Sequence, residues 1–236
     1  VGKKNVSIFR VMGTVLKRDE ALSKGLSKQL KNKQVNALYI SYQEELVFLT
    51  HDEILFFSKK GRLLKRVKNT DELDRMDGTN HGDIMVGSTQ HNRLYKYNKS
   101  GQVLFKEDMS YLTKPLRNLV VYRPYGNVAI YNKQEGVYLA MKAALDITQV
   151  TQDVSANSID VKVGFTTTFP AKIELVLVGE NNQITKQLLS KKLLAGKHVF
   201  HWKKVSKAYE NATVHLNLKA LYSTQNTIKK EIKLND

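Results

Sequence analysis

Short runs of alternating or continuous apolar residues follow one another closely from residue 37 to the end of the chain. Turns rich in Gly, Asn, Asp and Lys separate these runs, a pattern that predicts antiparallel β-strands in quick succession. In the first part of the chain the expected strands are 37–42, 46–50, 54–58, 62–67, 83–88, 93–98, 102–105, 127–131 and 136–141. The polar stretch 69–80 is expected to be a loop. The pattern therefore predicts an all-β protein.

The first 36 residues have a different rhythm and form a basic N-terminal segment. Residues 5–10 read as a short strand, and Leu22, Leu26 and Leu30 then recur every four residues among lysines. This spacing is compatible with a short helix capped by Asp19, packed through its leucines onto a neighbouring sheet, and also with a long basic loop. Gly25 would cost such a helix about 1 kcal/mol relative to alanine.

Residues 46–64 nearly repeat themselves forty positions later, at 86–104. The matching positions are His51 and His91, Lys59 and Lys99, and Gly61 and Gly101. A period near 40 residues is the length of one four-stranded propeller blade. A weaker third copy covers 127–141, so residues 37–143 are predicted to form a blade-like antiparallel meander.

Residues 81–104 resemble an NHL-type propeller repeat. That family has a glycine, an apolar strand, Thr-x-x-Asn-Arg, a second strand and a glycine turn, and Thr89, Asn92, Arg93 and Gly101 occupy those places. The usual aspartate before the threonine is Ser88 here. The resemblance implies propeller blades, but two to three blades make only a partial propeller, because closed propellers have about four to eight.

The residue pattern changes from about residue 144, where short strands are still expected but the forty-residue repeat ends. Residues 159–165 alternate strictly between apolar and other residues. Further strands are expected at 154–168, 172–178, 184–189, 198–202, 213–220 and 227–234, with a polar turn at 179–182. Seven or so strands in about 90 residues predict an Ig-like β-sandwich over 144–236. The break between the two parts is expected within 142–157.

Residues 160–236 resemble a bacterial Ig-like family found in flagellar hook-capping proteins and in C-terminal sorting domains of secreted Bacteroidetes proteins. Its hallmark is Leu-x-x-Gly-x-His-x-x-x-Trp, which Gly196, His198 and Trp202 match. Lys203 and Lys204 stand where that family has aspartate and glycine. The resemblance implies a periplasmic, cell-surface or secreted location.

Positive charge is the main feature of the composition. Lys and Arg number 38 against 22 Asp and Glu, which gives a formal net charge of +16. Six basic residues and no acidic one lie within ten positions: Lys59, Lys60, Arg62, Lys65, Arg66 and Lys68. This run suggests either weak attraction to a polyanion or a solvated lysine-rich surface. Tyrosines interleaved with basic residues could stack on single-stranded nucleic acid, but half-exposed strands also favour tyrosine.

Candidate chemistry is sparse. The chain has no cysteine, which excludes disulfides, thiol nucleophiles and zinc–thiolate sites. No phosphate-binding glycine loop, nucleophile elbow or zinc-protease helix is present. His198 and His201 are three apart in a predicted strand, so they point to opposite faces. Trp202 is interpreted as a core residue of the sandwich.

A metal site is not expected either at the histidines of the repeat or in the acidic cluster that precedes its second copy. That cluster consists of Asp71, Glu72, Asp74 and Asp77. It lacks the ligand spacing of an EF-hand and is interpreted as a solvated loop. No catalytic residue, metal or cofactor is assigned.

The sequence therefore predicts a non-catalytic binding or assembly module of the bacterial cell envelope or exterior. It would act through contacts with a protein partner. The first alternative is a nucleic-acid or polyanion binder that uses Lys59 to Lys68 and the N-terminal segment. The second alternative is a fragment of a propeller enzyme. No stretch approaches the roughly 18 uncharged apolar residues of a transmembrane segment.

Overall fold

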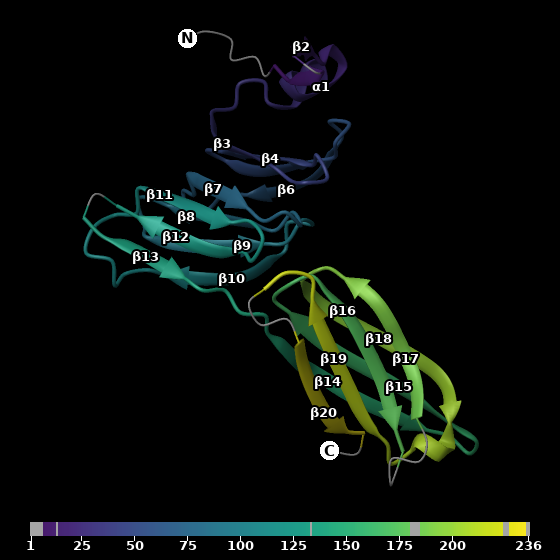
Figure 1. The fold of residues 1–236 in the computed structure, drawn as a ribbon. Coiled ribbons are helices and arrows are strands. Elements are labelled where there is room, and N and C mark those ends of the chain that lie inside the picture. Colours follow the sequence, from purple (N-terminus) through teal and green to yellow (C-terminus); the bar gives the residue numbers. More distant parts are fainter. Residues whose placement is uncertain (1–6, 13, 133, 180–184, 224–226, 235–236) are drawn as a thin grey trace. The chain divides into compact units, whose positions relative to one another are not determined.

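The computed structural model describes residues 7–12, 14–132, 134–179, 185–223 and 227–234. The chain divides into two compact units, Val1–Leu139 and Ala140–Asp236 (Figure 1). Antiparallel strands make up nearly all the regular structure of both units, and α1 (Glu20–Gln29) is the α-helix among the described residues. The predicted all-β class is therefore confirmed, and of the two alternatives for the N-terminal segment, a short helix or a long basic loop, the structure has the helix.

The first unit contains a hairpin, the helix and three blade-like sheets. The hairpin consists of β1 (Phe9–Met12) and β2 (Val15–Arg18). The first blade is β3 (Val35–Ile40), β4 (Leu46–Thr50), β5 (Glu53–Phe57) and β6 (Leu63–Lys68). The second blade is β7 (Arg75–Gly78), β8 (Ile84–Ser88), β9 (Arg93–Tyr97) and β10 (Val103–Asp108). The third blade has three strands, β11 (Asn118–Tyr122), β12 (Asn127–Tyr131) and β13 (Gly136–Leu139). In each blade the strands lie side by side in sequence order.

The blades stack face to face through their first strands, since β3 contacts β7 and β7 contacts β11. The core between the first two blades includes Val47, Leu49, Ile54, Phe56, Ile84, Val86, Tyr95 and Tyr97. Strands β4 and β8 are buried at every position, because each has a covered face on both sides. Gly87 lets the third blade approach the second closely, since a Cβ there would lie 2.7 Å from the side chain of Leu116.

Helix α1 covers the face of the first blade that is turned away from the second. Asp19 caps the helix by accepting a hydrogen bond from the Leu22 amide at 3.0 Å. Leu22, Leu26 and Leu30 are buried in one cluster with Leu46, Phe48, Leu55 and Phe57. The prediction that this leucine stripe packs onto a neighbouring sheet is confirmed. The helix thus shields an apolar sheet face that would otherwise be open to water.

Four strands were not predicted. Strand β7 lies inside the stretch 69–80, which was expected to be a loop, and β2, β11 and β14 (Leu145–Val154) were also missed. Strand β7 lacks an apolar pattern because its polar side chains bond to the next blade. Arg75 Nε donates to the Arg117 carbonyl at 2.8 Å, and Asp77 accepts from the Val121 amide at 2.8 Å. Strand β1 begins at Phe9, and Asn5 and Val6 of the expected first strand lie outside the described residues.

The repeat is real, but its register differs from the sequence alignment by two residues in one strand. Leu46 pairs with Phe57 as Ile84 pairs with Tyr97, so Leu46 corresponds to Ile84 and not to Val86. The reason is the turn between the second and third strands, which spans residues 51–52 in the first blade and 89–92 in the second. The glycine turns coincide as predicted, with φ of 75° and 76° at residues 61 and 101.

The described residues of the second unit form a seven-stranded sandwich. Its strands are β14, β15 (Ser158–Thr167), β16 (Ala171–Val178), β17 (Thr185–Leu193), β18 (Gly196–Ser206), β19 (Thr213–Ala220) and β20 (Thr227–Lys233), with a 3₁₀ turn η2 (Lys207–Tyr209). One sheet has the order β14-β15-β18 and the other β17-β16-β19-β20. Side chains of both sheets fill one core. Most of the turn expected at 179–182 lies outside the described residues, and β17 and β18 are longer than predicted.

Trp202 lies on the inner face of β18, as the sequence indicated, and His198 lies on the same face. The Trp202 ring stacks on the Phe200 ring, with 5.8 Å between the ring centroids. Its Nε1 donates a hydrogen bond to the Leu188 carbonyl of the other sheet at 3.1 Å. His198 Nε2 donates to the Leu194 carbonyl at 2.8 Å. His201 lies on the opposite face, where its Nε2 is 3.6 Å from a carboxylate oxygen of Asp160. The predicted opposite orientation of the two histidines is confirmed, and Trp202 ties the two sheets together.

The two units are expected to fold independently. Residues 140–236 have their own core, and a domain of about 100 residues can be stable alone. Expressed by itself, this segment should show one cooperative thermal transition and dispersed amide resonances. A disordered fragment would show that the sandwich depends on the blades.

Replacing Leu26 with alanine should destabilise the first unit by about 2–4 kcal/mol, because the side chain is fully buried between helix and blade. Urea unfolding followed by tyrosine fluorescence would measure the change. Leu64→Ala is the matched control, since Leu64 is 47% exposed and should change stability by less than about 1 kcal/mol. Equal effects of the two substitutions would contradict the covering role of α1.

Candidate functional site

The six basic residues of the Lys59–Lys68 run are all exposed, but they do not share one face. Lys59, Lys60 and Arg62 lie in or beside the β5–β6 turn at one end of the first blade, whereas Lys68 pairs with Glu53 in the ladder at the other end. Lys65 and Arg66 are neighbours on β6 and therefore point to opposite sides of the sheet. The structure thus divides the run between two ends and two faces of the blade.

Arg66 is held by contacts within the protein. Its guanidinium lies 3.1 Å from a Glu53 carboxylate oxygen and donates to Gln29 Oε1 of α1 at 3.1 Å. Lys65 packs on the other side, beside the position that a Gly101 Cβ would occupy. Part of the predicted basic surface therefore connects the helix and the second blade to the first.

An ion pair lies at equivalent positions in the first two blades, but the acidic and basic partners are exchanged between them. In the first blade, Lys33 Nζ lies 2.7 Å from a Glu53 carboxylate oxygen, and Glu53 begins β5. In the second blade, Arg93 begins β9 and pairs with Asp71. Lys33 and Asp71 each precede the first strand of their blade. The hydrogen bond from Lys33 and the charges of Lys33 and Arg66 lower the pKa of Glu53, although burial raises it.

The residues shared with the NHL pattern form contacts around the second blade. Thr89 donates its amide to Asp74 at 3.0 Å, and its hydroxyl bonds to the same carboxylate. Asn92, in a left-handed conformation at φ 48°, accepts a hydrogen bond from the Leu116 amide at 2.8 Å. Arg93 pairs with Asp71. These residues join the blade to the segments that precede and follow it.

The interpretation of the acidic cluster as a solvated loop was wrong. Asp71 and Asp74 bond to Arg93 and Thr89, Glu72 lies 3.3 Å from His91 Nε2, and Asp77 accepts the Val121 amide. Each carboxylate thus has its own partner within the blades. Among the described residues, no group of three His, Asp or Glu side chains is placed to hold a metal ion.

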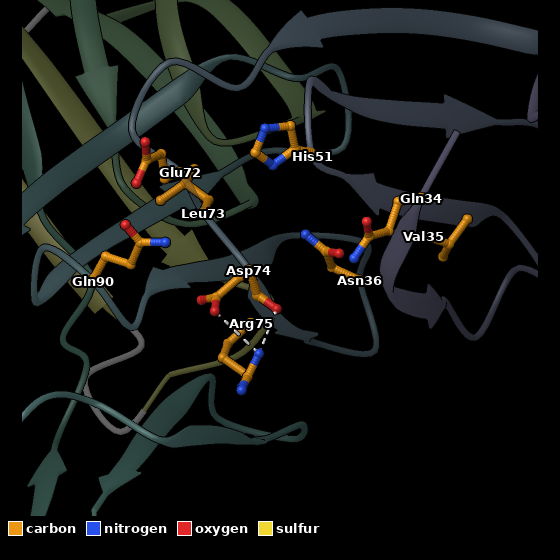
Figure 2. Close-up of a pocket in the computed structure, with 9 residues that line it drawn as sticks. All are labelled: Gln34, Val35, Asn36, His51, Glu72, Leu73, Asp74, Arg75 and Gln90. Carbon is orange, nitrogen blue, oxygen red and sulfur yellow. Dashed lines mark hydrogen bonds and ion pairs between the residues drawn. The ribbon is translucent and has the colours of Figure 1, made fainter. Parts of the chain in front are cut away.

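A polar pocket of about 450 Å³ lies where the segments entering β3 and β7 meet the turns of the first two blades (Figure 2). It is lined by Gln34, Val35, Asn36, His51, Glu72, Leu73, Asp74, Arg75 and Gln90. Figure 2 shows amide, imidazole and carboxylate groups around the space, with Asp74 bonded to Arg75. The lining contains no hydroxyl and no thiol. Its groups suit hydrogen bonding to a small polar ligand, and they offer no nucleophile beside a base.

The outer face of the third blade is uncharged and largely exposed, although Asn127 on it is buried. The strand registers place on this face Asn118, Val120, Tyr122, Asn127, Ala129, Tyr131, Gly136 and Tyr138, which we call the tyrosine face. Val120, Tyr122, Tyr131 and Tyr138 are 46–61% exposed. The opposite face of the same sheet is buried, through Leu119, Val121, Val128 and Ile130. Charged residues make up 25% of the chain, so an eight-residue sheet face without one is unusual for this surface.

Hydrogen bonds fix two rings of the tyrosine face. Asn127 Nδ2 donates to the Tyr138 hydroxyl at 2.6 Å, and Asn118 Nδ2 donates to the Tyr131 hydroxyl at 3.0 Å. Both partners lie on neighbouring strands, which restrains the rings across the sheet. A restrained aromatic surface loses little conformational entropy when it binds a partner.

The third blade lacks a hydrogen bond that joins the earlier blades. Tyr39, Asp77 and Val120 occupy equivalent positions in the three blades, because each lies the same number of residues before the turn that joins the first two strands of its blade. The Tyr39 hydroxyl donates to the Thr79 carbonyl of the second blade, and Asp77 accepts from Val121 of the third. Val120 has no such group, so any contact of this face with a partner is apolar at that position.

The tyrosines that the sequence placed beside basic residues divide into two sets. Tyr39, Tyr95 and Tyr97 are 2–5% exposed and belong to the blade core. Burial raises the pKa of Tyr97 to about 12. These rings cannot offer a face to nucleic-acid bases, whereas Tyr122, Tyr131 and Tyr138 can contact a partner. The sequence did not reveal this face, because β11 has apolar residues on both sides and therefore shows no alternation that would mark one side as exposed.

No protein family and no curated protein sequence matches the chain. Among solved structures it is similar to PorZ, an essential bacterial surface component of the type-IX secretion system of Porphyromonas gingivalis. PorZ is 7% identical, with a TM-score of 0.46 over 85% of this chain and 30% of that chain. The extracellular domain of a one-component system from B. thetaiotaomicron is 10% identical, with a TM-score of 0.40 over 98% of this chain and 33% of that chain.

The Pan2 WD40 domain of Neurospora crassa is also similar, at 12% identity and a TM-score of 0.32, over 82% of this chain and 63% of that chain. These neighbours are all-β, and the two bacterial ones are surface or extracellular components. The chain spans about a third of the length of those two proteins. None of the described helices is long and apolar enough to cross a membrane.

Replacing Glu53 with glutamine should reduce stability at neutral pH and have a smaller effect in acid. The folded-state pKa of Glu53 is lowered, so its stabilising effect is complete above the unfolded-state pKa of about 4.5. The effect is then lost as pH falls through the folded-state value. Urea unfolding at pH 7 and pH 3 would measure the difference. Glu107→Gln, at an exposed position, is the control, and a pH-independent effect of Glu53→Gln would contradict the ion-pair account.

Proposed function

We propose that this protein is a non-catalytic binding or assembly module of the bacterial cell envelope or exterior, and that the tyrosine face is its contact surface for a protein partner. The observation that carries the proposal is an exposed, uncharged sheet face with restrained tyrosines on a protein of net charge +16. Protein interfaces are depleted of charge at their centre and enriched in tyrosine. An exposed apolar patch on a soluble domain commonly marks an interaction site.

The position of the tyrosine face within the stack supports the proposal. The corresponding side of the first blade is covered by the second blade, and that of the second blade by the third. The third blade has the same kind of face, and no sheet formed by the described residues of the first unit covers it. A partner that packs on it would complete a series of face-to-face contacts that the chain has already made twice.

The proposed location and kinship rest on sequence resemblance. Residues 81–104 resemble an NHL-type repeat, and residues 160–236 resemble the bacterial Ig-like domains of envelope and secreted proteins. The hallmark residues Gly196, His198 and Trp202 have structural roles in the sandwich, since Trp202 and His198 both bond to backbone carbonyls. We favour a protein partner over a polyanion at Lys59–Lys68, because those six side chains do not form one surface.

Site-specific photo-crosslinking in cells that make the protein tests this proposal. A benzophenone amino acid at position 138 should give a discrete protease-sensitive adduct. The same group at position 42 is the matched control, since Tyr42 is 86% exposed but lies in the β3–β4 turn of the first blade. A nuclease-sensitive adduct, equal labelling at both positions, or no adduct at 138 would each argue against a protein partner at the tyrosine face.

Once the crosslinked protein is identified, Tyr138→Lys should weaken its binding by about tenfold or more, because a central interface tyrosine commonly contributes more than about 1 kcal/mol. Tyr42→Lys should leave the affinity unchanged. Thermal unfolding of both variants would confirm that neither has lost its fold. An affinity unaffected by Tyr138→Lys would remove the tyrosine face from the interface.

A further inference from the structure

Three lysines lie side by side across the outer face of the second sheet of the sandwich. Lys172 on β16 pairs directly with Lys192 on β17 and with Lys219 on β19. Directly opposite residues of an antiparallel pair point to the same face, with Cβ atoms about 5 Å apart. All three side chains are exposed. We call Lys172, Lys192 and Lys219 the lysine row.

The neighbouring positions do not neutralise the row. Lys172 Nζ lies 2.7 Å from a Glu174 carboxylate oxygen, and this is its ion pair. Within the part of the chain that the structure describes, Lys192 and Lys219 form no ion pair. The next row on the same face holds Ser190, Glu174, Asn217 and Lys229. Four lysines thus face one carboxylate across four strands.

Two like-charge pairs in direct register should destabilise the sheet. Opposite charges at such positions stabilise a sheet by about 0.2–1 kcal/mol, and like charges have the reverse effect. Local sequence choices that oppose the fold are characteristic of functional sites. An anion with several negative groups would remove the repulsion, and lysine ammonium groups are strong point-charge ligands for phosphate.

We propose that the lysine row is a binding site for a ligand with two or more neighbouring phosphate groups. This goes beyond the proposed protein-binding function and uses a different unit of the chain. Strands β17, β16 and β19 hold the three lysines in adjacent positions, while their flexible stems let each ammonium reach a separate phosphate oxygen. The site needs no pocket, because recognition comes from the spacing of three positive charges on one face of the sheet.

Titration calorimetry of the full chain with tripolyphosphate in low salt tests the site. The triple variant Lys172→Gln, Lys192→Gln and Lys219→Gln should lower the affinity at least about tenfold. The control variant Lys59→Gln, Lys60→Gln and Lys68→Gln removes the same charge from the first unit and should retain the affinity within about twofold. Equal losses in both variants would show nonspecific attraction, and a loss only in the control would move the site to the first unit. Either result, or no binding to the unmodified chain, would overturn the proposal.

Thermal unfolding provides a second readout that does not depend on the ligand. In low salt, Lys219→Gln should raise the melting temperature of the sandwich by about 1–5 °C, because it removes one like-charge pair. The gain should disappear in about 0.5 M NaCl, where the Debye length is only a few ångströms. Tripolyphosphate should raise the melting temperature of the unmodified chain more than that of the triple variant. A Lys219→Gln variant that is no more stable would show that the row is already compensated and carries no anion site.

Discussion

The first unit depends on one interaction, which is the packing of apolar blade faces against a covering helix or blade. The first blade is covered by α1 on one side and by the second blade on the other. The second blade lies between the first and the third. Its central strand β9 also carries Lys96, whose Nζ lies 3.6 Å from Asp83 in the buried interior. Burial lowers the pKa of Lys96, and the Asp83 carboxylate opposes that shift by stabilising the ammonium form.

The same interaction gives the third blade its particular surface. Its inner face packs on the second blade, while its outer face presents Val120, Tyr131 and Tyr138 to solvent. Hydrogen bonds from Asn118 and Asn127 hold two of the rings. An uncovered apolar face is unfavourable in a protein that acts alone, but it can serve as a binding surface in a protein that has a partner. The proposed function follows from this reasoning and needs no catalytic group.

The sequence indicated the class of fold because strand periodicity, glycine turns and the forty-residue repeat can all be recognised along the chain without knowing which strands pair. It offered α1 as one of two alternatives, because Leu22, Leu26 and Leu30 have helical spacing after a capping aspartate, but it could not exclude a loop. It failed at β7, where Arg75 and Asp77 point polar groups at the next blade, so the strand has no apolar alternation. The acidic cluster was misread for the same reason, since its partners are distant in sequence.

Surface features that depend on pairing between strands could not be read in advance. The six basic residues from Lys59 to Lys68 looked like one patch because they are close in sequence, but neighbouring residues of a strand point to opposite faces. The lysine row is the reverse case, since Lys172, Lys192 and Lys219 are far apart in sequence and adjacent only through the register. The tyrosine face likewise emerges only when β11, β12 and β13 are aligned.

Hydroxyl-radical footprinting tests the central claim, that the tyrosine face is covered by a protein partner in the native assembly. The purified chain and the protein in freshly isolated native complexes would be labelled in parallel, and oxidation would be measured at Tyr131, Tyr138 and Tyr42. The account predicts strong labelling of all three in the purified chain, and protection of Tyr131 and Tyr138 but not of Tyr42 in the complexes. Equal labelling of Tyr131 and Tyr138 in both preparations would contradict it.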